Sequence, residues 1–283
     1  MLIIINNKNI AFIGAGSMAE GMISGIVQSD QIPATQIYVT NRSNKNRLEE
    51  LHQTYGIQGK GNEELDFDQI DTFILAMKPK DAEAALSALK NKVKPHQLVL
   101  SVLAGITTSY LEDLLHDQQP VIRVMPNTSS TIGASATAMS SGRHVSKEQE
   151  LMAKEILGCM GEVYAIEENK MDVFTGIAGS GPAYFYYLME HIEKAGEAAG
   201  LDKKMSCAIG AQTLLGAAKM LLETGETPTV LREKVTSPNG TTAAGLHALE
   251  QFGGGEAIEQ AIKEAAKRSE EISKEMNQLN LVR

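Results

Sequence analysis

A short glycine-containing turn near the N-terminus most constrains the fold of this chain. Gly14 ends the apolar run Ile10–Gly14 and begins the spacing G-x-G-x-x-A with Gly16 and Ala19, and a helical pattern that includes Met22 comes next. In such a turn the first glycine permits a tight bend, and the second lets the backbone approach a pyrophosphate. The helix start then presents free N–H groups and the positive end of its dipole to the anion. The turn therefore predicts dinucleotide binding, and the alternative is a tight turn without a ligand.

Short apolar runs alternate with helical patterns through the first part of the chain. The expected strands span residues 10–14, 37–40, 72–76, 98–102, 121–124, 136–139 and 162–166. Helices are expected after the first strand, around Leu48 and Leu51, and over residues 81–89 and 146–157. Nearly continuous apolar strands are typical of a parallel sheet that is covered on both faces. Repeated units of this kind predict a doubly wound, Rossmann-type α/β domain.

From Asn169 onward the pattern is helical, with helices expected over residues 183–199, 203–223 and 256–279. We therefore predict a dinucleotide-binding domain over residues 1–167 and an all-helical domain over residues 168–283. The run Ala183–Met189 is apolar around nearly the whole helix, and such a helix is normally buried on all sides. This predicts dimerisation through the helical domain, and the alternative is a central helix of a monomeric bundle.

Composition excludes several classes of protein. The chain carries 26 basic and 35 acidic residues, a net charge of −9 that disfavours nucleic acid and anionic membranes as partners. Cys159 and Cys207 form neither a metal spacing nor a disulfide framework, and the histidines form no metal motif, which predicts a metal-free cytoplasmic protein. The apolar start Met1–Ile5 is shorter than the ~7–15 residues of a secretory core. We also expect no apolar run that approaches the ~20 residues of a membrane span.

The end of the second predicted strand indicates which dinucleotide is bound. An NAD enzyme usually places a carboxylate there for the ribose 2′-hydroxyl, but this chain has Asn41, Arg42 and Ser43. Arg42 can pair with a 2′-phosphate, and its neighbours can donate to it. The pattern favours NADPH over NADH, and the alternative is a solvated arginine.

Two further strand ends carry residues suited to a ligand. The third strand ends in Ala76, Met77, Lys78 and Pro79, at the edge where ligands bind in this fold. Met125–Asn127 offers a rigid turn with an amide side chain, for which a purely structural role is the alternative.

Two loops in the helical part also have ligand-binding character. Ser180, Gly181, Pro182 and Ala183 are small residues that lead into the apolar helix. Asn239, Gly240, Thr241 and Thr242 form a turn and a helix start, where the amides of Gly240, Thr241 and Thr242 are expected to point at one carboxylate. The alternative is ordinary N-capping by a hydroxyl.

These motifs together resemble pyrroline-5-carboxylate reductases over essentially the whole chain. The resemblance rests on residues 12–19, 76–79, 123–127, 179–184 and 235–242. One departure is Asn239, where the family usually has glycine, and asparagine tolerates the left-handed conformation better than other residues with a side chain.

The resemblance implies an oxidoreductase of proline biosynthesis that reduces the C=N bond of L-1-pyrroline-5-carboxylate with NAD(P)H. It implies that amides around Gly240 and Thr241 hold the substrate carboxylate, that Thr242 acts on the ring nitrogen, and that Ser180–Ala183 shape the pocket. The implied cofactor residues are Gly14, Ala15, Gly16, Ser17, Met18, Ala19, Asn41, Arg42, Ser43, Ala76, Met77, Lys78 and Pro79. It further implies a homodimer whose helical domains interleave, so that one chain completes its partner's site, and larger rings of dimers in some members.

Two other functions fit parts of the sequence. A β-hydroxyacid dehydrogenase shares the two-domain plan, but its catalytic lysine would have to be Lys170, which precedes the Gly-Ser-Gly loop. A catalytically idle, regulatory relative would be expected to have damaged substrate loops, and here both are intact apart from Asn239.

Overall fold

The computed structural model describes residues 5–281, without the side chains of Asn6 and residues 276–281. The apolar start Met1–Ile4, part of the segment tested above for a secretion signal, lies outside these residues. Contacts divide the chain into two compact units: Met1–Gly179 with Glu264–Arg283, and Ser180–Lys263. Each unit is described by itself below. The predicted domain boundary between residues 167 and 168 stays a prediction, because contacts within one chain do not show which parts belong together in an assembly.

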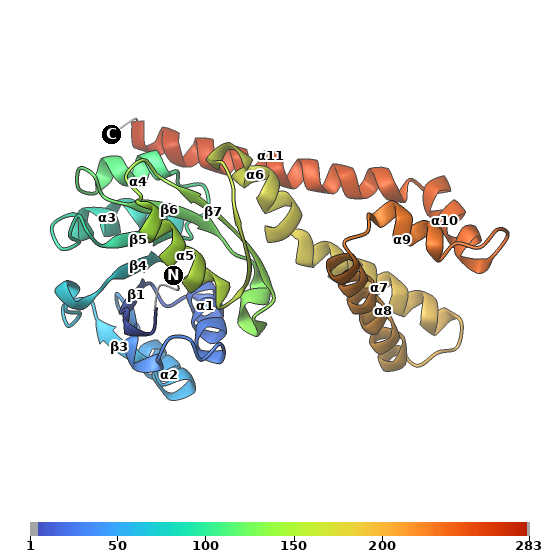
Figure 1. Ribbon diagram of the computed structural model, residues 1–283, viewed down its shortest axis with the longest axis horizontal. Helices are drawn as coiled ribbons and strands as arrows, with labels where there is room; N and C mark the ends of the chain where they lie inside the picture. The colour runs from blue at the N-terminus through green and yellow to red at the C-terminus, as the bar shows by residue number, and fades with distance from the viewer. Residues whose placement is uncertain (1–4, 282–283) are drawn as a thin grey trace. The chain divides into compact units, whose positions relative to one another are not determined.

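An eight-stranded sheet forms the centre of the first unit, in the order β3-β2-β1-β4-β5-β6-β7-β8 (Figure 1). The strands are β1 (Ile10–Ile13), β2 (Ile37–Asn41), β3 (Gln58–Gly61), β4 (Thr72–Leu75), β5 (Leu98–Ser101), β6 (Val121–Met125), β7 (Ser135–Ser141) and β8 (Gly161–Ala165). All neighbours are parallel except β6 and β7, which run antiparallel. The doubly wound α/β fold is thereby confirmed. The sequence missed β3 because Gln58-Gly-Lys-Gly61 contains no apolar residue.

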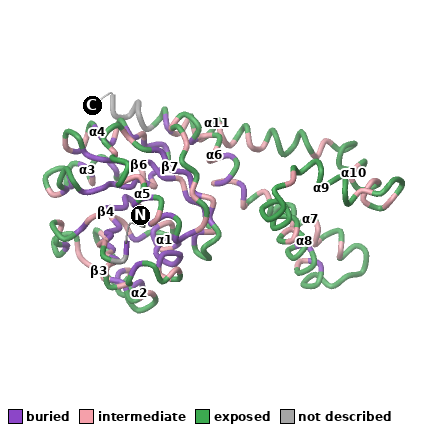
Figure 2. The backbone as a smooth tube through the Cα atoms, viewed as in Figure 1, coloured by how far each residue is buried: buried purple, intermediate pink, exposed green. Residues whose placement is uncertain are grey.

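Helices cover both faces of this sheet. One apolar cluster joins the sheet to α1 (Ser17–Gln28), α2 (Lys45–Tyr55) and α5 (Lys147–Gly158). A second cluster joins the other face to α3 (Ala82–Lys90) and α4 (Thr108–Leu114). Figure 2 shows the buried backbone concentrated in the central strands of the sheet and in α1. The central strands β1, β4 and β5 are mostly apolar on both faces because both faces are covered.

Several side-chain hydrogen bonds hold the segment that leads out of the first unit. This segment comprises η6 (Glu168–Lys170), α6 (Met171–Phe174) and the π-helical turn η7 (Thr175–Gly179). Glu168 accepts from the Thr108 hydroxyl at 2.7 Å and from buried Arg123 at 3.4 Å. The Asn127 amide donates to the Ala178 carbonyl at 3.1 Å, and the Ser269 hydroxyl donates to Asp172 at 2.7 Å. Asn127 therefore has a structural contact at this point, one of the two roles considered for it from the sequence.

The second unit is helical. It contains α7 (Gly181–Ala198), α8 (Lys203–Thr224), α9 (Pro228–Lys234), α10 (Thr241–Gln251) and the start of α11 (Gly254–Leu281). Between Asn169 and Leu281, all of it within the described chain, there is no strand, which confirms the predicted helical character. The apolar run of α7 is not covered within one chain. Phe185, Tyr186, Tyr187 and Leu188 are 51%, 64%, 63% and 47% exposed.

The helix α8 corrects one expectation from the sequence. We expected no apolar run near the length of a membrane span, yet α8 has 22 residues and a mean hydropathy of 1.3 over its most apolar window, of which 11% is buried. Its alanines, glycines and methionines keep the window apolar despite the lysines near its ends. Among the described residues, α8 is the one helix that is long and apolar enough to cross a membrane by length and composition.

Candidate functional site

Three of the predicted cofactor segments meet at the carboxyl ends of β1, β2 and β4. The Gly14 amide donates to the Thr40 carbonyl at 3.1 Å, and the Ala76 amide donates to the Ile13 carbonyl at 3.0 Å. Gly14 has φ +118°, and a Cβ there would lie 2.7 Å from the Ala76 backbone. Successive strands are added on opposite sides of β1, so this edge is the switch point where ligands bind in open α/β sheets.

The turn leaves the start of α1 open. Gly16 is the N-cap, makes no side-chain capping bond and is exposed, and a Cβ there would meet nothing within 4 Å. The amides at the start of a helix have no partner inside the helix, so those of Ser17, Met18 and Ala19 are donors available to an anion. Ala19 is fully buried against the sheet. This geometry fits a pyrophosphate, which needs space at the second glycine and backbone donors beside it.

The residues after β2 form a tight turn. The Asn41 side-chain oxygen accepts from the amides of Ser43 at 3.1 Å and Asn44 at 3.0 Å. Asn41 thus shapes the turn with its oxygen, and its NH₂ group remains a donor. Arg42 and Ser43 are exposed on this turn. Lys78 is exposed after β4, at the N-cap of the short turn η4 (Pro79–Asp81), with Pro79 in its first position.

A small hollow of about 110 Å³ lies at the same edge of the sheet and was missed by sequence reasoning. Its lining comes from β1, β2, the loop after β3, the segment around Phe67 and helix α3: Ile13, Thr40, Asn62, Glu63, Phe67, Ala85, Ala88, Leu89 and Lys92. Most of its lining is apolar, with polar groups at Asn62, Glu63 and Lys92. No local motif marks this hollow, because its walls come from segments that meet only in the folded chain.

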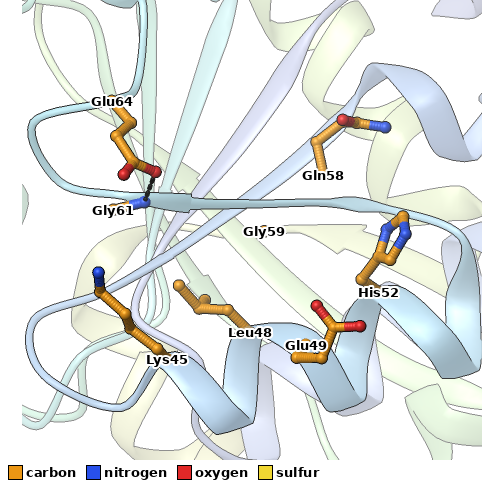
Figure 3. A pocket seen from close by; sticks show the side chains of 8 residues that line it. All are labelled: Lys45, Leu48, Glu49, His52, Gln58, Gly59, Gly61 and Glu64. Atoms are coloured by element: carbon orange, nitrogen blue, oxygen red, sulfur yellow. Dashed lines mark hydrogen bonds between the residues drawn. The ribbon is translucent and has the colours of Figure 1, made fainter.

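A larger hollow of about 320 Å³ lies between α2 and the edge strand β3, away from the predicted residues (Figure 3). It exists because β3 carries Gly59 and Gly61, and Gly59 lies so close to Leu48 that a Cβ would be 3.0 Å from it. Glu64 accepts from the Gly61 amide at 3.0 Å and shares the lining with Glu49 and Lys45. Two carboxylates against one lysine disfavour a phosphate in this hollow.

The first predicted substrate loop lies at the start of α7, in the second unit. Ser180 is the N-cap and its carbonyl accepts from the Ala183 amide at 3.0 Å. Pro182 stands in the first turn, where its missing N–H leaves no donor unsatisfied, as expected for this position. Gly181 is buried.

The second substrate loop supports one expectation and corrects another. Asn239 has φ +58°, so the left-handed conformation expected of it is confirmed. The Gly240 amide, however, donates to the Ser237 carbonyl at 3.0 Å, so it is not among the donors left for a carboxylate. The turn uses that amide to reverse the chain before α10. Gly240 is the N-cap of α10 without a side-chain capping bond, which leaves the amides of Thr241 and Thr242 at an open helix start.

Titratable clusters do not suggest a metal centre. Within residues 5–281, no group of three or more His, Cys, Asp or Glu side chains is placed to hold an ion. A further charged group beside the dinucleotide turn is Arg47 of α2, which the sequence did not single out. Its Nε donates to the Ala15 carbonyl at 3.2 Å.

Comparisons with known proteins agree with the dinucleotide-binding fold of the first unit and the helical character of the second. Residues 168–272 match the family described as pyrroline-5-carboxylate reductase dimerisation, and residues 9–105 match the family described as NADP oxidoreductase, coenzyme F420-dependent. The chain is 68% identical over 273 residues to pyrroline-5-carboxylate reductase 1 of Bacillus spizizenii, covering 96% of this chain and 92% of that protein.

Solved structures of similar proteins extend the comparison. A pyrroline-5-carboxylate reductase from Coxiella burnetii has a TM-score of 0.85 and 33% identity, covering 95% of this chain and 99% of that one. A Plasmodium falciparum pyrroline carboxylate reductase, with NADP bound, has a TM-score of 0.83 and 25% identity, covering 95% and 99% of the two chains.

Proposed function

The chain belongs to the pyrroline-5-carboxylate reductase family, and on this premise we propose that it reduces L-1-pyrroline-5-carboxylate to L-proline, the last step of proline biosynthesis, with NADPH as the preferred donor. The observation that carries the proposal is a pair of open helix starts in one chain. The start of α1 follows a dinucleotide turn, and the start of α10 presents two amides beside the hydroxyl of Thr242.

The first unit holds the dinucleotide in this proposal. The amides of Ser17, Met18 and Ala19 bind the pyrophosphate, and Arg42 with Asn41 and Ser43 binds the 2′-phosphate. The hollow beside Phe67 takes the adenine, because a flat aromatic base needs apolar walls. When bound, the reduced nicotinamide supplies the hydride that the C=N carbon of the substrate accepts. The segment after β4, with Ala76, Met77, Lys78 and Pro79, borders this cofactor.

The second unit holds the substrate. The amides of Thr241 and Thr242 bind its carboxylate, and the Thr242 hydroxyl hydrogen-bonds its ring nitrogen. Ser180, Gly181, Pro182 and Ala183 shape the remaining wall, and Asn239 sets the turn. A protonated imine is already a good electrophile, so the chain needs to orient it and place charge rather than provide a strong acid. We further propose a cytoplasmic homodimer in which the exposed apolar run of α7 is covered by the second copy, with rings of dimers as a further state.

A turnover assay tests this function. Purified protein should oxidise NADPH when L-1-pyrroline-5-carboxylate is added, and it should not reduce NADP⁺ when a β-hydroxyacid is added. Thr242→Ala should lower kcat/KM roughly 100-fold, as losing one positioned hydrogen bond to the reacting group does in other enzymes, while its affinity for NADPH stays within about twofold. Failure of the wild type to turn over with either NADPH or NADH would refute the function. Unchanged kinetics of the variant would refute the role of Thr242 alone.

Arg42 tests the choice of dinucleotide. Arg42→Ala should weaken NADPH binding about tenfold to a hundredfold, the range for losing a charge-assisted phosphate contact, and leave NADH binding nearly unchanged. Titration of both cofactors against the wild type and the variant measures this directly. An equal loss for both cofactors would place Arg42 away from the 2′-phosphate.

A further inference from the structure

An arginine of helix α2 contacts the backbone of the dinucleotide turn. Arg47 Nε donates to the Ala15 carbonyl at 3.2 Å. Its two terminal nitrogens bind carboxylates, Glu20 on α1 and, at 3.2 Å, Glu50 on α2. The side chains of Arg47 and Glu20 are 23% and 35% exposed, so this contact is partly buried. The hydrogen bond to Glu20 is the largest cause that raises the pKa of Arg47, so this guanidinium is charged at neutral pH.

The negative charge of Glu20 is close enough to the proposed pyrophosphate site to weaken cofactor binding. It lies in the first turn of α1, the helix whose open start faces a pyrophosphate in the proposed function. A bare carboxylate at that place would repel the phosphates, because charges at this range interact appreciably even near a protein surface. Arg47 binds one oxygen of Glu20, and the Tyr55 hydroxyl donates to the other at 3.3 Å. Both oxygens are thus engaged from the side of α2.

The contact with Ala15 fixes the backbone between the two glycines of the turn. In a trans peptide the C=O and the following N–H point in opposite directions. The Ala15 carbonyl is held toward Arg47, so the Gly16 amide is directed to the opposite side of the peptide plane. Glycines allow this peptide many orientations, and the arginine selects one. The planar guanidinium can hold a carbonyl and a carboxylate at once, which an ammonium group cannot do with the same geometry.

We propose that Arg47 is a positioning residue for dinucleotide binding. It neutralises Glu20 and orients the Ala15–Gly16 peptide, so that the turn presents donors to the pyrophosphate without a competing negative charge. The inference rests on the proposed cofactor site. It assigns Arg47 a role distinct from that of Arg42, because the pyrophosphate is common to NADH and NADPH whereas the 2′-phosphate is not.

Equilibrium binding of NADPH and NADH to the full-length protein tests this assignment. Arg47→Met should weaken both cofactors by a similar factor of about ten, the size expected for exposing one nearby charge and freeing one peptide. Glu20→Gln alone should bind at least as well as the wild type. The double variant Arg47→Met/Glu20→Gln should regain part of the loss, about threefold, because the repelling charge is gone. Arg47→Lys should fall between the wild type and Arg47→Met.

Arg143→Met is the matched control. Arg143 is also ion-paired, with Glu112 at 2.7 Å, but it follows β7 and lies outside the turn, so its loss should leave both affinities unchanged. Wild-type affinity in Arg47→Met, an equal loss in Arg143→Met, or a double variant as weak as Arg47→Met would each overturn the proposal. If the wild type itself bound neither cofactor, the proposed function would fail instead.

Discussion

Replacing Gly14 by alanine is expected to destabilise the first unit and abolish dinucleotide binding. The new methyl group would lie 2.7 Å from the backbone of Ala76, which cannot move without disturbing β4. Alanine would also have to adopt φ +118°, a conformation that residues with a Cβ rarely take. Overpacking of this kind costs about 1–3 kcal/mol and left-handed strain about 1–2 kcal/mol. Thermal or urea unfolding should therefore show a loss of roughly 2–5 kcal/mol.

Gly16→Ala provides the matched control for that result. A methyl group at Gly16 meets nothing within 4 Å, so stability should stay within about 0.5 kcal/mol of the wild type. NADPH binding should still fall at least tenfold, because the methyl group occupies the space that a pyrophosphate needs. Equal stability losses in the two variants would contradict the assignment of a packing role to Gly14 and a ligand-binding role to Gly16. Full NADPH affinity in Gly16→Ala would remove the turn from the cofactor site.

Local patterns were sufficient to predict most of the sheet and the dinucleotide turn. The apolar runs of β1, β4 and β5 are buried on both faces, so their composition reports their environment directly. The turn was predictable because its geometry depends on residues that are close in sequence. In contrast, β3 is a strand only because its backbone pairs with β2, and its sequence contains no apolar residue that would predict it.

The parts of the site that the sequence did not reveal depend on contacts between distant residues. Arg47 reaches Ala15 across 32 positions of the chain, and nothing in its neighbourhood distinguishes it from a solvated helix arginine. The motif predicts that the amide of Gly240 faces a ligand because it shows a helix start, but it does not show the turn hydrogen bond to Ser237 that uses this amide. Spacing therefore located the candidate site, and the folded backbone decided which donors remain available.

Two glutamates in the apolar run of α7 are expected to convert the protein into an inactive monomer. Phe185 and Leu188 are 51% and 47% exposed in one chain. They are three residues apart, so they lie on one face of the helix. Both lie inside the region that matches the dimerisation family. Burying unpaired carboxylates costs several kcal/mol each, so Phe185→Glu/Leu188→Glu should weaken association at least 1000-fold, which sedimentation velocity can detect.

The same variant separates assembly from cofactor binding. The cofactor residues lie in the first unit, so the monomer should still bind NADPH with nearly wild-type affinity. If the partner chain completes the substrate site, as the resemblance to the family implies, turnover should fall at least 100-fold, because orientation of the substrate would be lost. Phe185→Leu/Leu188→Met keeps the surface apolar and should remain dimeric and active. A glutamate variant that sediments as a monomer yet keeps wild-type turnover would show that one chain suffices for catalysis. A variant that remains a dimer would place the interface elsewhere in the helical unit, with the exposed helix α8 as the next surface to test.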